Sequence, residues 1–95
     1  MNDALVSIQI IPKTKDQDVI PYVDAAIEVI AQSGVAYEVH PLETTMEGDL
    51  STLLQVIERM HAKMNELGVD SIISQVKIYQ NANGVSMNKL TEKYR

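Results

Sequence analysis

The feature that most constrains the fold is a helical pattern that ends twice in a Gly-Val pair, at residues 34–35 and 68–69, and each time enters a strand-like segment. A glycine just past the last helical turn is a common C-terminal stop, because it adopts the left-handed conformation without steric cost. A strand-like segment also precedes each helix. The chain therefore divides into two strand–helix–strand halves, although their identity is too slight to prove a duplication.

The first half begins with a strand pattern. Residues 4–11 are β-branched and apolar with a period of two, and Pro12 is expected to end this strand. Asp18 is placed to cap a helix, and Pro21 suits a first helical turn. Apolar residues then recur at steps of three and four, at Ile20, Val23, Ile27 and Ile30, which predicts an amphipathic helix from residue 20 to about residue 33.

The second half predicts a hairpin, a helix and a strand. Residues 35–39 alternate, His40 to Leu42 form a turn, and residues 44–47 form a short extended piece. Gly48 and Asp49 open a helix that is expected to end at Gly68. Its expected apolar stripe consists of Leu50, Leu53, Leu54, Ile57, Met60, Met64 and Leu67. Residues 71–80 form a last alternating strand, followed by a turn at 81–84 and a polar tail.

The order βαββαβ predicts an α+β, ferredoxin-like sandwich. In this fold an antiparallel four-stranded sheet carries both helices on one face, and the first strand lies between the fourth and the third. The 95 residues are expected to form one domain, residues 1–95, because compact domains of about 100 to 150 residues are the most common.

Composition narrows the class of protein. The chain is 45% hydrophobic and 22% charged, which suits a globular core, and its net charge of −5 is the wrong sign for attracting nucleic acid. The absence of cysteine removes disulfides and thiolate zinc sites. No secretory signal or membrane-spanning segment is expected, so we expect a cytoplasmic protein that binds neither nucleic acid nor membrane.

The sheet face away from the helices is expected to be mixed in polarity. It should carry Leu5, Ser7, Gln9 and Ile11 from the first strand and Ile73, Gln75, Lys77 and Tyr79 from the last. Such a face suits an interface with another copy of the chain, since small domains gain stability by association. A solvated sheet with scattered apolar residues is the alternative.

The sequence contains few patterns that are typical of catalytic or metal-binding sites. His40 and His61 have no second histidine at metal-ligand spacing, and structural roles are favoured for both. Ser7 lacks any nucleophile-elbow or triad signature, and Gly48 is flanked by acids rather than by a phosphate-binding loop. We therefore expect no catalytic residue, no metal and no cofactor.

The acidic cluster Glu43, Glu47 and Asp49 is the most informative local feature. Asp49 is explained equally well as a helix cap. Glu47 follows two threonines and a methionine at a strand end, so hydroxyls and a carboxylate are expected in one region. A site of this kind favours a cationic or hydrogen-bond-donating small molecule.

Three segments carry a family resemblance: SIQIIP in the first strand, TTMEGD at residues 44–49, and the tail SMNKLTEKY. Together they resemble the small thiamine-binding proteins related to YkoF, and Thr44 to Asp49 match that family's Thr-x-x-Glu-Gly-acid pattern. The resemblance implies a ferredoxin-like fold, homodimers or homotetramers formed through sheet faces, and recognition of thiamine or its pyrimidine portion. The implied ligand-binding residues are Ser7, Gln9, Tyr37, Thr44, Thr45 and Glu47.

The sequence therefore predicts a non-enzymatic, homo-oligomeric protein that binds thiamine or a related pyrimidine or thiazolium compound, with Glu47 supplying the charge. The main alternative is a structural or regulatory oligomeric module that retains no ligand. An enzyme that uses Ser7, Glu47 or a histidine is a third class.

Overall fold

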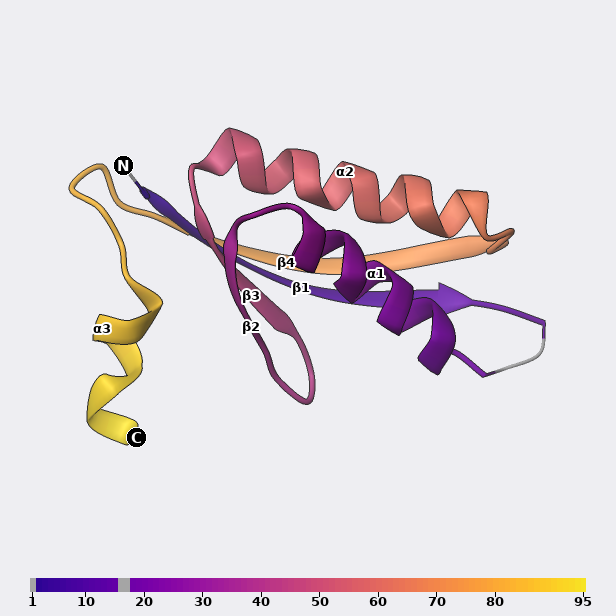
Figure 1. Cartoon of the computed structure of the whole chain (residues 1–95), viewed down its shortest axis with the longest axis horizontal. Coiled ribbons are helices and arrows are strands. Elements are labelled where there is room, and N and C mark those ends of the chain that lie inside the picture. The colour runs from indigo at the N-terminus through magenta and orange to yellow at the C-terminus, as the bar shows by residue number, and fades with distance from the viewer. Residues whose placement is uncertain (1, 16–17) are drawn as a thin grey trace.

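The protein is described from a computed structural model that covers residues 2–15 and 18–95 (Figure 1). Its strands are β1 (Ala4–Lys13), β2 (Ala36–Val39), β3 (Thr44–Gly48) and β4 (Ser71–Gln80). Its helices are α1 (Ile20–Gln32), α2 (Leu50–Glu66) and α3 (Met87–Thr91), and a 3₁₀ turn follows at Glu92–Tyr94.

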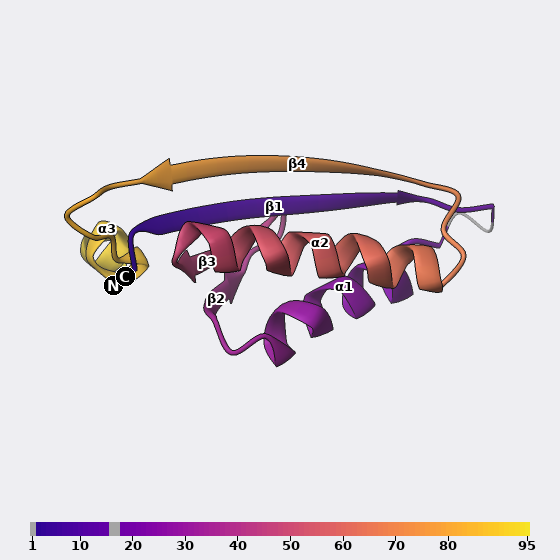
Figure 2. The same cartoon turned by 90° about the horizontal axis from the view of Figure 1, so that it is seen from above.

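The sheet is antiparallel with the order β2-β3-β1-β4, so β1 lies between β3 and β4 as predicted. Both long helices cover the same face of this sheet (Figure 2). The ferredoxin-like α+β fold predicted from the sequence is confirmed.

The core lies between this sheet face and the helices. β1 alternates strictly, with Ala4, Val6, Ile8 and Ile10 buried against the helices. Met46 of β3 joins them, and the helices contribute Ala26, Ile30, Leu53, Val56, Met60 and Met64. The predicted faces of β1 are correct, because register pairs Ser7 with Lys77 and Gln9 with Gln75 on the other face.

The buried stripe of α2 differs from the predicted one. Val56 is fully buried, whereas Leu54 is 40% exposed. The positions 53, 56, 60 and 64 follow one face of the helix, and Leu54 lies about 100° around the axis from Leu53. The sheet therefore contacts a narrower stripe than the apolar composition of the helix indicates.

Pro12 does not end the first strand, contrary to the prediction. β1 runs on to Lys13, with Pro12 opposite Ile72 of β4. The pairing between β1 and β3 stops at Ile8 and Thr44, so beyond this point β1 has a neighbour on one side only. A proline is tolerated there because an edge strand needs no hydrogen bond on its open side.

The helix ends follow the sequence signals. Gly34 and Gly68 both have positive φ, at 85° and 82°, as expected of residues that stop a helix. Asp49 is the N-cap of α2, and its side chain accepts a hydrogen bond from the Thr52 N–H at 3.1 Å. At α1 the N-cap is Val19, and Asp18 acts from one position earlier by accepting from the Ile20 N–H at 3.2 Å.

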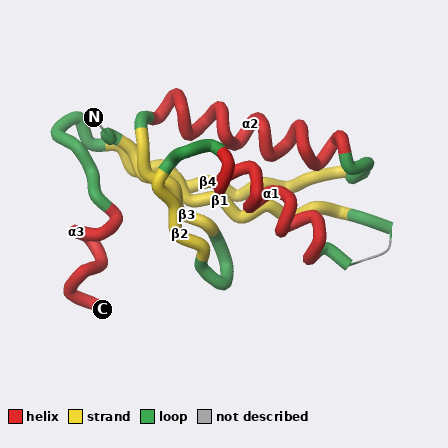
Figure 3. Tube along the Cα trace, in the orientation of Figure 1, coloured by secondary structure: helices red, strands yellow, loops and turns green. Residues whose placement is uncertain are grey.

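The polar tail contains a helix that the sequence did not predict. α3 lies apart from α1 and α2, beside the end of the sheet where the chain begins (Figure 3). Ser86 caps it by accepting from the Lys89 N–H at 3.2 Å, and none of its residues is buried. No helix within the described ranges is long and apolar enough to cross a membrane.

Candidate functional site: an apolar pocket beside the β2–β3 turn

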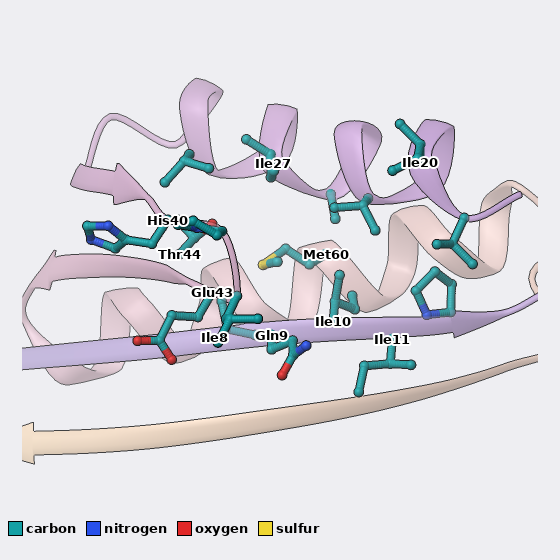
Figure 4. A pocket seen from close by; sticks show the side chains of 17 residues that line it. Ile8, Gln9, Ile10, Ile11, Ile20, Ile27, His40, Glu43, Thr44 and Met60 are labelled. Carbon is teal, nitrogen blue, oxygen red and sulfur yellow. The ribbon is translucent and has the colours of Figure 1, made fainter.

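A pocket forms because β3 is shorter than β1. β3 leaves β1 at Ile8, and the turn between β2 and β3 then closes the gap toward α1. The space between α1, the far half of β1 and this turn is a cavity of about 330 Å³ (Figure 4). The pocket is therefore a direct product of unequal strand lengths.

The pocket walls are mainly aliphatic. β1, α1 and the turn each provide one wall, and Met60 of α2 reaches in from the helix layer. The apolar lining residues are Ile8, Ile10, Ile11, Pro12, Val19, Ile20, Val23, Ala26, Ile27, Val39, Pro41, Leu42 and Met60. Three of them are more than half exposed, Ile20 at 63%, Val39 at 51% and Leu42 at 75%, so apolar surface continues out to the rim.

Four polar side chains lie on this apolar lining: Gln9, His40, Glu43 and Thr44. His40, Glu43 and Thr44 gather at one end, and Ile20 lies toward the other (Figure 4). The His40 N–H donates to the Glu43 carbonyl at 2.8 Å, which closes the turn that holds both side chains. His40 Nε2 also lies 3.5 Å from Glu38 Oε2.

This arrangement suits a small, flat, cationic molecule. Aliphatic walls remove the faces of a ring from water, and the few polar groups at one end fix its orientation. Glu43 is the only carboxylate among the described lining residues, and a carboxylate gives a cation its strongest kind of hydrogen-bonded partner.

The structure divides the six predicted ligand-binding residues into separate groups. Gln9 and Thr44 both border the pocket, but Thr44 is buried on the helix side, whereas the Gln9 side chain lies on the open face of the sheet, opposite Gln75 (Figure 4). Ser7 and Thr45 are cross-strand neighbours on the open face of the sheet, away from the helices. They line a shallow hollow of about 450 Å³ together with Lys77, whose positive charge disfavours a cation there.

Glu47 is already engaged by other parts of the chain. Its Oε1 accepts from the Met87 N–H at 2.7 Å, and its Oε2 accepts from the Asn2 side-chain amide at 2.9 Å. It therefore ties the tail and the start of the chain to β3, and it does not line the pocket.

Tyr37 lies on neither of these surfaces. Register pairs it with Met46, on the helix side of β2, and it is 38% exposed. Thr45 and Glu47 occupy the opposite face, because successive residues of a strand point to alternate sides. The six residues thus do not form one site.

The sequence contains residues of this pocket, Glu43 and His40, but their pattern does not predict that they line a ligand site. Glu43 belonged to the acidic cluster, in which Glu47 was expected to carry the charge, and His40 was expected to be structural. The third member, Asp49, is the cap of α2. Hydrogen bonds from the Thr52 hydroxyl, and then from the Thr52 N–H, lower the pKa of the Asp49 carboxyl below its usual value.

Comparison with known proteins gives relatives of the same length and fold. A UPF0045 protein of Clostridium perfringens is 40% identical over all 95 residues, covering 100% of both chains. A solved domain of unknown function from Bacillus cereus is also 40% identical, with a TM-score of 0.91, and the match covers 100% of this chain and 93% of that one.

A solved protein from Thermotoga maritima, named as a candidate for thiamine biosynthesis or salvage, is 30% identical with a TM-score of 0.87. That match covers 98% of this chain and 99% of the other. The family described as thiamine-binding protein matches residues 6–95 of the sequence. With its fold, its length and its sequence all in agreement, the chain belongs to the thiamine-binding protein family.

Proposed function

We propose that the protein binds thiamine, or a closely related pyrimidine or thiazolium compound, in the pocket beside the β2–β3 turn and does not transform it. The observation that carries this proposal is the aliphatic cavity of about 330 Å³ with Glu43 at its polar end, in a chain of the thiamine-binding family. Small-molecule sites typically have volumes of about 300 to 1,000 Å³ and mostly apolar walls.

The chemistry of thiamine matches this lining. Its thiazolium ring is a permanent cation, which the Glu43 carboxylate complements. Its aminopyrimidine has hydrogen-bond donors and acceptors, which the Thr44 hydroxyl is able to pair. The aliphatic walls from β1 and α1 cover the faces of both rings.

Within this proposal the ligand is bound and not transformed, and the polar groups of the lining act as hydrogen-bond partners. Among its described residues Thr44 carries the only hydroxyl, and the chain contains no cysteine. His40 is the one histidine there, and it lies against Glu38 at the rim.

We also propose that the working form is a homo-oligomer in which the open face of the sheet meets a second copy. Ile73 and Tyr79, both 49% exposed, lie on this face with Leu5 and Ile11 as their cross-strand neighbours. The polar pairs Ser7–Lys77 and Gln9–Gln75 lie between these two apolar pairs, and such a mixed face suits an interface that also holds polar contacts.

Calorimetric titration with thiamine tests the ligand. Glu43→Gln keeps the size of the side chain and removes its charge, and loss of a charge-assisted contact should weaken binding by about 1.5 to 3 kcal/mol, roughly ten- to a hundredfold. Glu58→Gln is the matched control, because it makes the same change at an exposed position of α2 outside the pocket.

Two outcomes of this titration would contradict the proposal. If wild type and variants give no heat with thiamine, the structural or regulatory module without a ligand is the correct class. If Glu43→Gln binds as tightly as wild type, the cation is not held in this pocket.

A further inference from the structure

We propose that this pocket selects the unphosphorylated cation and rejects its phosphate esters. This inference rests on the proposed function and concerns the form of the ligand that the same site accepts. It is carried by two features of the pocket: the charge of its lining and the blocked N-terminus of α1.

The described lining offers a phosphate neither lysine nor arginine. It contains the Glu43 carboxylate, and its one histidine, His40, already faces the Glu38 carboxylate at 3.5 Å. Lys15 lines a different hollow, together with Asp70. A phosphate in the pocket would therefore lose its hydration without gaining an ion pair, at a large cost in free energy.

The beginning of α1 would otherwise be the natural place for a phosphate. Val19 and Ile20, at this helix end, both line the pocket, and the free N–H groups of a helix N-terminus attract anions. Here the Ile20 N–H is taken by the Asp18 carboxylate at 3.2 Å, and Pro21 has no N–H to offer. The helix end thus presents a negative charge, and two of its first three residues have no N–H free for an anion.

The described residues 18–21 at this helix end carry one acid and no base. Lys13 is the nearest lysine along β1, one residue beyond the lining residue Pro12. Any phosphate contact made by Lys13 is open to a direct test by substitution.

The test compares thiamine, thiamine monophosphate and thiamine diphosphate by calorimetric titration in one buffer at about 0.15 M salt, where exposed charges are screened beyond about 8 Å. We expect the monophosphate to bind at least tenfold more weakly than thiamine. Asp18→Asn removes the charge at the helix end. It should therefore reduce the ratio of thiamine affinity to monophosphate affinity severalfold while leaving the affinity for thiamine nearly unchanged.

Two controls separate local charge from other effects. Glu58→Gln makes the same change in net charge away from the pocket, so it should preserve the ratio of affinities. Lys13→Ala should preserve it as well, and a monophosphate affinity that falls in Lys13→Ala alone would overturn the inference.

The two proposals fail in different ways. Equal or tighter binding of the monophosphate in the wild type overturns phosphate rejection and leaves the ligand proposal standing. An absence of heat with thiamine itself overturns both.

Discussion

The Glu47 carboxylate accepts a hydrogen bond of 2.7 Å from the backbone N–H of Met87, 40 residues further along the chain. The same side chain accepts from the Asn2 amide at 2.9 Å, and the Asn2 carbonyl in turn accepts from the Val85 N–H at 3.0 Å. These bonds connect β3, the chain start and the tail in one small network. Further along the tail, Arg95 reaches Glu38 of β2 at 2.7 Å.

Glu47→Gln should therefore loosen the tail and leave the ligand pocket intact. Glutamine keeps one acceptor but turns an amide N–H₂ toward Asn2 or Met87, and hydrogen bonds to charged groups contribute about 1.5 to 3 kcal/mol. We expect the Met87 amide to exchange its hydrogen about tenfold faster or more, as measured by NMR. The affinity for thiamine should stay within twofold of wild type.

A weakened thiamine affinity in Glu47→Gln, with unchanged exchange at Met87, would instead assign Glu47 to the ligand. Glu58→Gln serves again as the control for net charge, because Glu58 is exposed on α2 and lies outside the pocket. In this control both measurements should match the wild type.

Filling the pocket should block the ligand without a change in charge. Val23 lines the cavity from α1 and is half-buried, so Val23→Phe directs a ring into the open volume. We expect thiamine binding to fall below detection in a titration that measures the wild type, because the ring occupies space that the ligand needs. The melting temperature of the variant should differ from that of the wild type by only a few degrees.

The control is the same substitution at an exposed valine. Val76 of β4 is 39% exposed and does not line the pocket, so Val76→Phe should leave binding unchanged. Full thiamine affinity in Val23→Phe would place the ligand elsewhere, with the hollow beside Ser7 and Thr45 as the next site to test.

The fold was predictable because its signals are local in the sequence. The period-two pattern of residues 4–11 and the two glycine stops are visible without any knowledge of neighbouring strands. The same rule of alternation already implied that Thr44 and Thr45 face opposite sides of the sheet. Their adjacency at a strand end and the family resemblance together led to the prediction of one site.

The pocket and the tail helix depend on tertiary relationships that no local pattern expresses. The cavity exists because β3 stops opposite Ile8, and strand length relative to a partner cannot be read from either strand alone. α3 spans only five residues and buries none of them, so it has no amphipathic signature. Its position depends on Glu47, whose partner lies far away in the sequence.

The cap of α2 gives a prediction for the pH dependence of stability. The pKa of the Asp49 carboxyl is lowered by the Thr52 hydroxyl and N–H, so the folded state holds this proton less tightly than the unfolded state. The stabilisation is therefore fully present above the usual pKa of about 3.8 and is lost as the pH falls through the lower, folded-state value.

Asp49→Ala should lower the melting temperature at pH 7, and the difference from wild type should shrink as the pH falls below about 4. Thr52→Val removes the larger cause of the shift and keeps the backbone donor, so NMR titration should find the Asp49 pKa closer to its usual value in this variant. A melting-temperature difference that is constant from pH 7 to pH 2 would contradict the cap as the source.

The last prediction concerns assembly through the open face of the sheet. Ile73 lies opposite Ile11 on this face and is 49% exposed in the isolated chain. An interface between two copies of the kind that stable oligomers form would bury on the order of 2,000 Å² or more in total. Light scattering should therefore detect no monomer of the wild type at micromolar concentration.

Ile73→Glu places an unpaired charge in the middle of such an interface, so this variant should elute as a folded monomer with an unchanged far-UV circular dichroism spectrum. The control Leu54→Glu makes the same change at a partly exposed position on α2, and its oligomeric state should match that of the wild type. A wild type that is monomeric at these concentrations would instead favour a sheet face that is solvated in the working protein.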